Sequence, residues 1–188
     1  MATQQNGYAI VPHATYDQFR SYALTHGVDV DYAHQNQCWD ICALLWYQYG
    51  KRLQTGNGYA YGCWTLRRNQ NATPPFSQVS NKFDIKRGDV VVFNKHGSYY
   101  TGHIAFADED YRGGSTLKVL GQNQGQGSAK GTPSNIANYN MSYFLGGFRN
   151  SNWQSTPPTP PPPVPGTTVE RTTFPWSIYA NKFRSGSR

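Results

Sequence analysis

The chain has 188 residues and a formal net charge of +7, and 15% of its residues are aromatic. This length suits one domain with an appendage, and the aromatic content excludes a chain that is disordered throughout. The mean hydropathy of −0.69 and the lack of any apolar stretch of about 20 residues exclude an integral membrane protein. The first residues, 1–6, have neither the basic nor the apolar region of a secretory signal.

Two helices are predicted in the first third of the chain. Residues 15–24 form an amphipathic pattern that Thr15 can cap. Residues 28–37 are polar and are predicted to be a loop. Residues 38–49 are apolar on nearly every side, which is typical of a central, buried helix. Residues 56–75 are aromatic and are predicted to be rich in loop.

The hydrophobic pattern changes to that of strands after Gly88. Four strands are predicted, at residues 89–93, 103–107, 117–120 and 143–149. Helices followed by an antiparallel sheet indicate an α+β domain. We find no internal repeat.

A proline-rich segment divides the chain. Residues 156–165 contain seven of the twelve prolines and predict an extended spacer. The chain is therefore divided into a main domain at 1–155, a linker at 156–166 and a tail at 167–188. The tail is too short for an independent core, so it is a flexible end or the beginning of a truncated module.

Cys38 is the candidate nucleophile. It begins the predicted 38–49 helix, where the helix dipole is expected to lower the pKa of a thiol. The alternative is a small buried hydrophobic residue, which is what we expect of Cys42 and Cys63. A zinc site built from His34 and these cysteines is disfavoured, because paired short-spaced ligands are absent.

His103 is the candidate base, because it begins a predicted strand beside an apolar run. A histidine held in the core by hydrogen bonds is the alternative. A catalytic base needs a group that orients its other nitrogen, and the sequence GQNQG at 121–125 offers side-chain amides. A cysteine at a helix start, a histidine on a strand and Asn123 after a strand form a papain-type arrangement.

Acidic residues precede the candidate nucleophile. Asp29 and Asp31 alternate along the loop and Asp40 follows in the helix. Clustered hard oxygen ligands suit calcium, although the spacing is not that of an EF-hand. From the residues alone, a solvated acidic turn is the favoured interpretation.

Four short segments in order resemble the landmarks of a known family. They are QCWD at 37–40, GDVVVF at 88–93, GHIA at 102–105 and VLGQN at 119–123. Together they resemble CHAP domains, the cysteine, histidine-dependent amidohydrolases/peptidases that cut peptidoglycan with a papain-like active-site layout. The resemblance covers roughly residues 15–149. A proline-rich linker after the domain is typical of phage lysins, in which a wall-binding module follows.

The resemblance implies roles for individual residues. Cys38 would be the nucleophile, His103 the general base and Asn123 the residue that orients His103. Many relatives have a glutamate at the position of Gly121, so this chain is expected to use three members. The oxyanion would be held by the Cys38 backbone N–H, with Gln37 as a second donor.

The resemblance also implies a calcium site. Calcium-binding relatives have aspartates at the positions of Asp29, Asp31 and Asp40. The backbone carbonyl groups of Ala33 and Gln35 would complete the ligand set.

The expected function is hydrolysis of an amide bond in bacterial peptidoglycan through a thiol acyl-enzyme. An N-acetylmuramoyl-L-alanine amidase is slightly favoured over an endopeptidase of the stem peptide or cross-bridge. A non-catalytic wall-binding module is disfavoured because Cys38 and His103 are both present. Nucleic-acid binding is disfavoured because lysines and arginines occur at most in pairs. Without a signal peptide, we expect synthesis in the host cytoplasm and access to the wall through holin pores or on a virion.

Overall fold

The structure is a computed structural model that describes residues 13–70, 75–97, 99–125 and 131–153, together with the backbone of 3–5 and 8–10. These last two segments are strands β1 (Thr3–Gln5) and β2 (Tyr8–Ile10), which pair antiparallel. The linker and tail expected at 156–166 and 167–188 lie outside the described residues. The boundary at residue 155 therefore stays a prediction.

Both predicted helices are confirmed. Helix α1 spans Tyr16–Ala23, and the Thr15 hydroxyl caps it by accepting from the Gln18 backbone N–H at 3.2 Å. Helix α2 spans Cys38–Tyr47 and is buried from Asp40 to Trp46. In the part of the chain that the structure describes, α2 is the longest helix, and none is long and apolar enough to cross a membrane.

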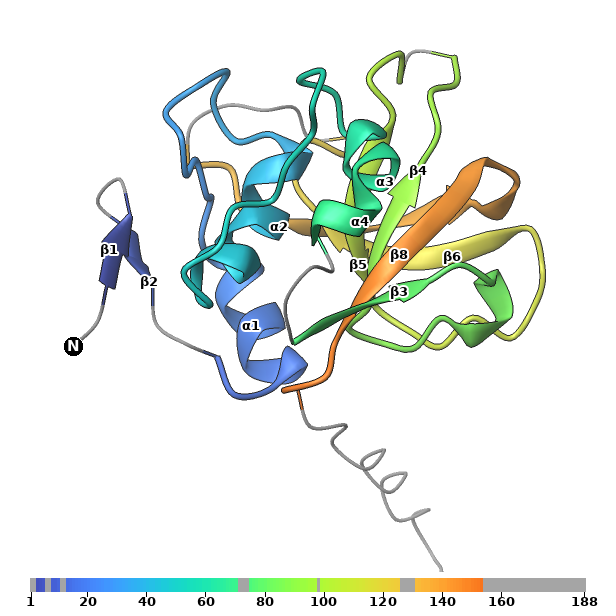
Figure 1. Cartoon of the computed structure of the whole chain (residues 1–188), viewed down its shortest axis with the longest axis horizontal. Coiled ribbons are helices and arrows are strands. Elements are labelled where there is room, and N and C mark those ends of the chain that lie inside the picture. Colours follow the sequence, from blue (N-terminus) through green and yellow to red (C-terminus); the bar gives the residue numbers. More distant parts are fainter. Residues whose placement is uncertain are drawn as a thin grey trace, which may run out of the picture. The chain divides into compact units, whose positions relative to one another are not determined.

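A six-stranded antiparallel sheet follows the helices (Figure 1). Its strands are β3 (Phe76–Val79), β4 (Val90–Phe93), β5 (His103–Ala107), β6 (Thr116–Gly121), β7 (Asn135–Asn140) and β8 (Phe144–Asn150). Their order is β3-β8-β4-β5-β6-β7. The four predicted strands correspond to β4, β5, β6 and β8, so the α+β fold is confirmed.

Both faces of the central strands are buried. In β4, Val90 and Val92 pack with residues of α1 and α2, whereas Val91 and Phe93 belong to a second core on the opposite face. Because side chains alternate along a strand, a strand covered on both faces is apolar throughout. This explains why the sequence of β4 reads as a continuous apolar run.

The two edge strands were not predicted from the sequence. Strand β3 exposes Ser77 and Gln78, and β7 (NIANYN) contains three asparagines. Polar residues are typical of strands at a sheet edge, where one side is solvated. The loop-rich segment at 56–75 also contains two short helices that were not predicted, α3 (Gly62–Thr65) and α4 (Arg67–Gln70). Single 3₁₀ turns occupy Lys82–Asp84 and Met141–Tyr143.

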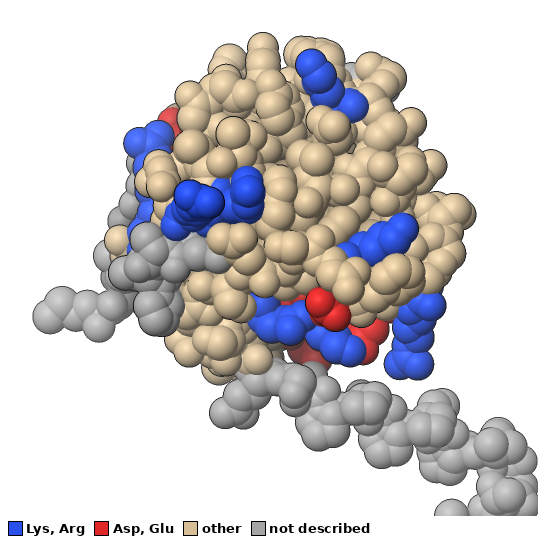
Figure 2. Space-filling view, turned by 45° about the vertical axis from the view of Figure 1, so that its right-hand side comes forward, with Lys and Arg blue, Asp and Glu red and all other residues tan. Residues whose placement is uncertain are grey.

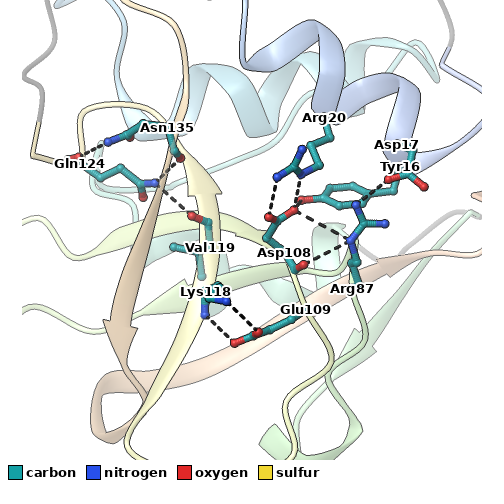
Figure 3. Close-up of polar contacts among 10 residues, drawn as sticks. All are labelled: Tyr16, Asp17, Arg20, Arg87, Asp108, Glu109, Lys118, Val119, Gln124 and Asn135. Atoms are coloured by element: carbon teal, nitrogen blue, oxygen red, sulfur yellow. Dashed lines mark hydrogen bonds and ion pairs between the residues drawn. The ribbon is translucent and has the colours of Figure 1, made fainter. Parts of the chain in front are cut away.

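Helix α1 is tied to the end of β5 by a polar cluster (Figure 3). Arg20 donates to the Asp108 carboxylate from Nε at 2.7 Å and from Nη2 at 3.0 Å, and the Tyr16 hydroxyl donates to it at 2.9 Å. Two donors on one planar guanidinium make this pairing directional. The cluster therefore fixes α1 against the sheet that carries His103.

Candidate active site

Cys38 lies where two strands separate. Strand β5 pairs with β4 from His103 to Phe106, but with β6 only at Phe106 and Ala107. Among the described strands, the first part of β5 therefore has no partner on its β6 side. The Cys38 sulfur occupies this side and faces the backbone N–H of Ile104, the residue after His103.

Burial dominates the ionisation of Cys38. It raises the pKa of the thiol to about 11, although the backbone N–H groups of Ile104, Cys38 and Trp39 favour the thiolate. The neighbouring Asp40 carboxylate also raises this pKa. The prediction that the helix start lowers the pKa of Cys38 was therefore wrong for the protein alone. Loss of solvent around the thiol raises its pKa more than the backbone N–H groups at the helix start lower it.

His103 is enclosed on the opposite face of β5 from Ile104. It is 1% exposed and stacks on the ring of Tyr139, with centroids 4.4 Å apart and planes 10° from parallel. Burial lowers the pKa of the imidazole to about 4. His103 is therefore neutral at pH 7 and has a nitrogen that can accept a proton.

The amide beside His103 belongs to Gln124 and not to Asn123. Gln124 Oε1 lies 2.9 Å from His103 Nε2, whereas Asn123 Nδ2 donates to Gln37 Oε1 at 2.9 Å. Asn123 has a positive φ of 52°, a conformation that asparagine adopts more readily than most residues. This turn reverses the chain after β6 and brings Gln124 back over the strand.

Gln122 connects the same turn to the loop before α2. Its side chain pairs with both backbone groups of Val28, accepting from the N–H at 2.7 Å and donating to the carbonyl at 2.8 Å. It also donates to the Gln37 carbonyl at 3.1 Å. Gln122 and Gln124 were missed as site residues, and only their position in the amide-rich GQNQG segment signalled them.

Gln37 is engaged at both ends of its side chain. Its oxygen accepts from Asn123, and its Nε2 donates to the His34 carbonyl. Its backbone N–H donates to the Asp40 carboxylate at 2.7 Å. The side chain therefore braces the start of α2, and its contribution to an oxyanion hole stays a prediction.

Three carboxylates converge beside this helix start. One oxygen each from Asp29, Asp31 and Asp40 lie within 4.8 Å of one another. Burial, together with the charges of Asp31 and Asp29, raises the pKa of Asp40 to about 7. Asp29 is 5% exposed, and its Oδ1 has no hydrogen-bond partner among the described residues.

This set fits a hard divalent cation. Burying a carboxylate oxygen without a hydrogen-bond partner costs free energy unless a cation or a donor pairs with it. Carboxylates are the ligands that hard divalent cations prefer. Among the described residues it is the only group of three or more potential metal-ligating side chains. The alternative zinc set of His34 and the cysteines is therefore not brought together.

Comparisons with known proteins show what this chain is similar to. The chain is 32% identical over 117 residues to a D-alanyl-L-alanine endopeptidase of Streptococcus phage B30. The matched region covers 60% of this chain and 25% of the relative. The chain therefore spans about a quarter of the length of that relative.

A solved structure and a family model also match this chain. The crystal structure of the endolysin LysIME-EF1 superposes with a TM-score of 0.56 at 24% identity, covering 76% of this chain and 67% of that one, and supports the fold. The model of the CHAP domain matches residues 27–123, which contain Cys38, His103 and the three aspartates. The chain belongs to the CHAP-domain family.

Proposed function

We propose that this chain is a peptidoglycan hydrolase that cleaves an amide bond with Cys38 as nucleophile and His103 as general base. One observation carries the proposal. The Cys38 sulfur lies at the unpaired start of β5, against the residue that follows a buried, neutral histidine. A thiol, a neutral imidazole and an amide that holds the imidazole are the components of thiol acyl transfer.

The steps of the reaction follow from the neutral ring of His103 and its hydrogen bond to Gln124. Its Nε2 is held by Gln124, so Nδ1 is the nitrogen left to take the Cys38 proton as the sulfur attacks the carbonyl carbon. The C–N bond then breaks, the amine leaves with the proton from His103, and a thioester remains. Water, deprotonated by His103, hydrolyses the thioester and restores the thiol. The Cys38 backbone N–H would stabilise the oxyanion.

The bond cleaved is proposed from the named relative. The sequence alone slightly favoured an N-acetylmuramoyl-L-alanine amidase. The relative in phage B30 carries the name of an endopeptidase, which supports a bond between two amino acids. We therefore place the endopeptidase reaction first and keep the amidase as the second candidate.

Mass spectrometry of fragments from purified Gram-positive cell walls tests the proposal. If the endopeptidase assignment is correct, released fragments keep the stem peptide on muramic acid and carry a new peptide terminus. Stem peptides freed from the sugar would assign the amidase reaction instead. Cys38→Ser is the control, and equal release by this variant and the wild type would overturn the thiol mechanism.

We propose Ca²⁺ as the ion held by the three aspartates. Calcium accepts irregular sets of carboxylates and carbonyls, whereas magnesium requires near-octahedral geometry. The backbone carbonyls of Ala33 and Gln35 are the further ligands that we propose. The bound ion would cross-link the loop before α2 to the helix itself and neutralise the repulsion among the carboxylates.

The partner proposed for the surface is the cell wall. Figure 2 shows lysines and arginines spread over the visible face and not gathered into one groove. Basic side chains dispersed in this way suit an extended anionic lattice better than a nucleic-acid duplex, and the net charge of the whole chain, +7, has the matching sign. We propose that the protein acts on the wall as phage lysins do, after holin release or on a virion.

A further inference from the structure

The side chain of Gln124 has a fixed orientation. Its Nε2 donates to the carbonyl of Val119 at 3.2 Å and to that of Asn135 at 2.7 Å (Figure 3). Asn135 Nδ2 in turn donates to the Gln124 carbonyl at 2.9 Å. Because carbonyl oxygens only accept hydrogen bonds, the NH₂ group must face β6 and β7, and Oε1 must face His103.

This orientation determines which nitrogen of His103 carries hydrogen. Gln124 Oε1 is only an acceptor, so the hydrogen of the 2.9 Å contact must lie on His103 Nε2. A neutral imidazole has one N–H, which leaves the lone pair on Nδ1. Gln124 therefore selects the tautomer that a base acting through Nδ1 requires.

Gly121 provides the space that Gln124 occupies. A Cβ on residue 121 would lie 2.8 Å from Gln124 Oε1 and 3.2 Å from its Cδ, and 3.1 Å from the Cβ of Ala105. Gly121 does not have a positive φ, so its backbone conformation would accept a side chain. The obstacle to a side chain at 121 is chiefly the amide of Gln124.

We propose that Gln124, lying over Gly121, is the positioning residue of His103 and holds it as the Nε2–H tautomer. The inference rests on the proposed function for its catalytic meaning, since it deepens the role of His103 there. Asn123 then serves the start of α2 through Gln37, and not the base.

Two substitutions separate this role from a structural one. Gln124→Leu and Gln124→Glu both remove the NH₂ group that donates to Val119 and Asn135. Only Gln124→Glu keeps an oxygen that accepts from His103 Nε2. A loss of activity or stability that both variants share therefore measures how the NH₂ group anchors the turn. A difference between the two variants measures the effect of the oxygen that accepts from His103.

The decisive measurement is the ¹⁵N chemical shifts of the His103 ring in the full-length labelled protein above pH 7. We expect an Nε2–H pattern in the wild type and in Gln124→Glu, and a shift toward the Nδ1–H tautomer or a mixture in Gln124→Leu. Wall hydrolysis by Gln124→Leu should fall between about 10-fold and 10⁴-fold, the larger factor being the cost of a wrong histidine tautomer in a serine-protease triad. Gln124→Glu should recover part of this loss.

Gln70→Leu is the matched control. Gln70 is a glutamine of 2% exposure whose side chain pairs with the backbone N–H and carbonyl of Gln54. It should lose stability without a change in tautomer. An unchanged Nε2–H pattern in Gln124→Leu would overturn the proposal.

The ring spectrum does not depend on hydrolysis. If the wild type releases nothing from walls but shows the expected tautomers, the proposed function fails and the structural part of this inference holds. If the wild type hydrolyses walls and Gln124→Leu keeps its full rate, the positioning role fails and the proposed function holds.

Discussion

Asn123 Nδ2 donates to Gln37 Oε1 at 2.9 Å, and this hydrogen bond joins the turn after β6 to the residue that precedes the nucleophile. A double-mutant cycle of Asn123→Ala and Gln37→Ala should give a coupling of about 0.5–1.5 kcal/mol in the free energy of unfolding, which is the usual net value of one hydrogen bond. Urea unfolding measures it. Additive effects would show that the bond does not form in solution.

Asn123→Ala is also expected to reduce activity, but only in part. Asn123→Ala should slow wall lysis less than His103→Ala, because it loosens the start of α2 and leaves the base in place. Turbidity of purified walls measures both rates. Loss of lysis as complete as that of His103→Ala would return the orienting role to Asn123.

Cys38→Ser should abolish wall lysis while leaving the fold intact, because a serine hydroxyl is a much weaker nucleophile without a stronger base. Loss of a residue of this kind typically costs several powers of ten in rate. Cys42→Ala and Cys63→Ala are the controls, since both thiols are fully buried in the core, Cys42 within α2 and Cys63 within α3. They should lose some stability and keep most activity per folded molecule. A folded, active Cys38→Ser protein would contradict the assignment.

Chelation should lower the melting temperature and slow lysis, and Ca²⁺ should restore both better than Mg²⁺. The stabilisation by a bound ion grows as RT ln(1 + [L]/Kd), so the melting temperature should rise with calcium concentration. Asp31→Ala should have the lowered melting temperature and no longer respond to chelator. Asp84→Ala, which removes an exposed carboxylate outside the cluster, should respond as the wild type does. Calorimetry that detects no binding of Ca²⁺ to the wild type would leave the aspartates as an acidic turn.

Stability should decrease in acid because of His103. Burial lowers its pKa from 6.5 to about 4, so between these values the unfolded chain binds more protons than the folded one. The stabilisation by neutral His103 is complete above pH 6.5 and is lost as pH falls toward 4. At about 1.4 kcal/mol per pH unit, the loss is at most about 3.5 kcal/mol.

The difference in unfolding free energy between the wild type and His103→Gln isolates this effect. Other titrating groups, Asp40 among them, contribute to both proteins and cancel. The difference should decline from pH 7 to pH 4. A difference that does not change over this range would mean that His103 is hydrated in solution.

The central elements could be predicted because their patterns are extreme. Helix α2 and strand β4 are apolar nearly throughout, and their burial on every side is the physical reason. Strands β3 and β7 could not be predicted, because their polar sequences are stabilised by a neighbouring strand and not by their own composition. Local pattern therefore identified the middle of the sheet and missed its edges.

The site was predictable in its residue types and less so in its contacts. The helix start, strand start and acidic loop identified Cys38, His103 and the aspartates as candidates. The choice between Asn123 and Gln124 depends on a positive φ at Asn123 and on the space that the missing side chain of Gly121 leaves for Gln124. Neither property can be read from a row of adjacent amides.

The shared space above Gly121 has a consequence for protein engineering. Positions 121 and 124 form one unit, because a side chain at the first and the glutamine at the second compete for the same volume. A chimaera of this domain with another member of the family should therefore not be joined between them. A junction there would either force two side chains into one place or leave an empty pocket beside the imidazole, and crossover points before β6 or after Gly125 avoid both.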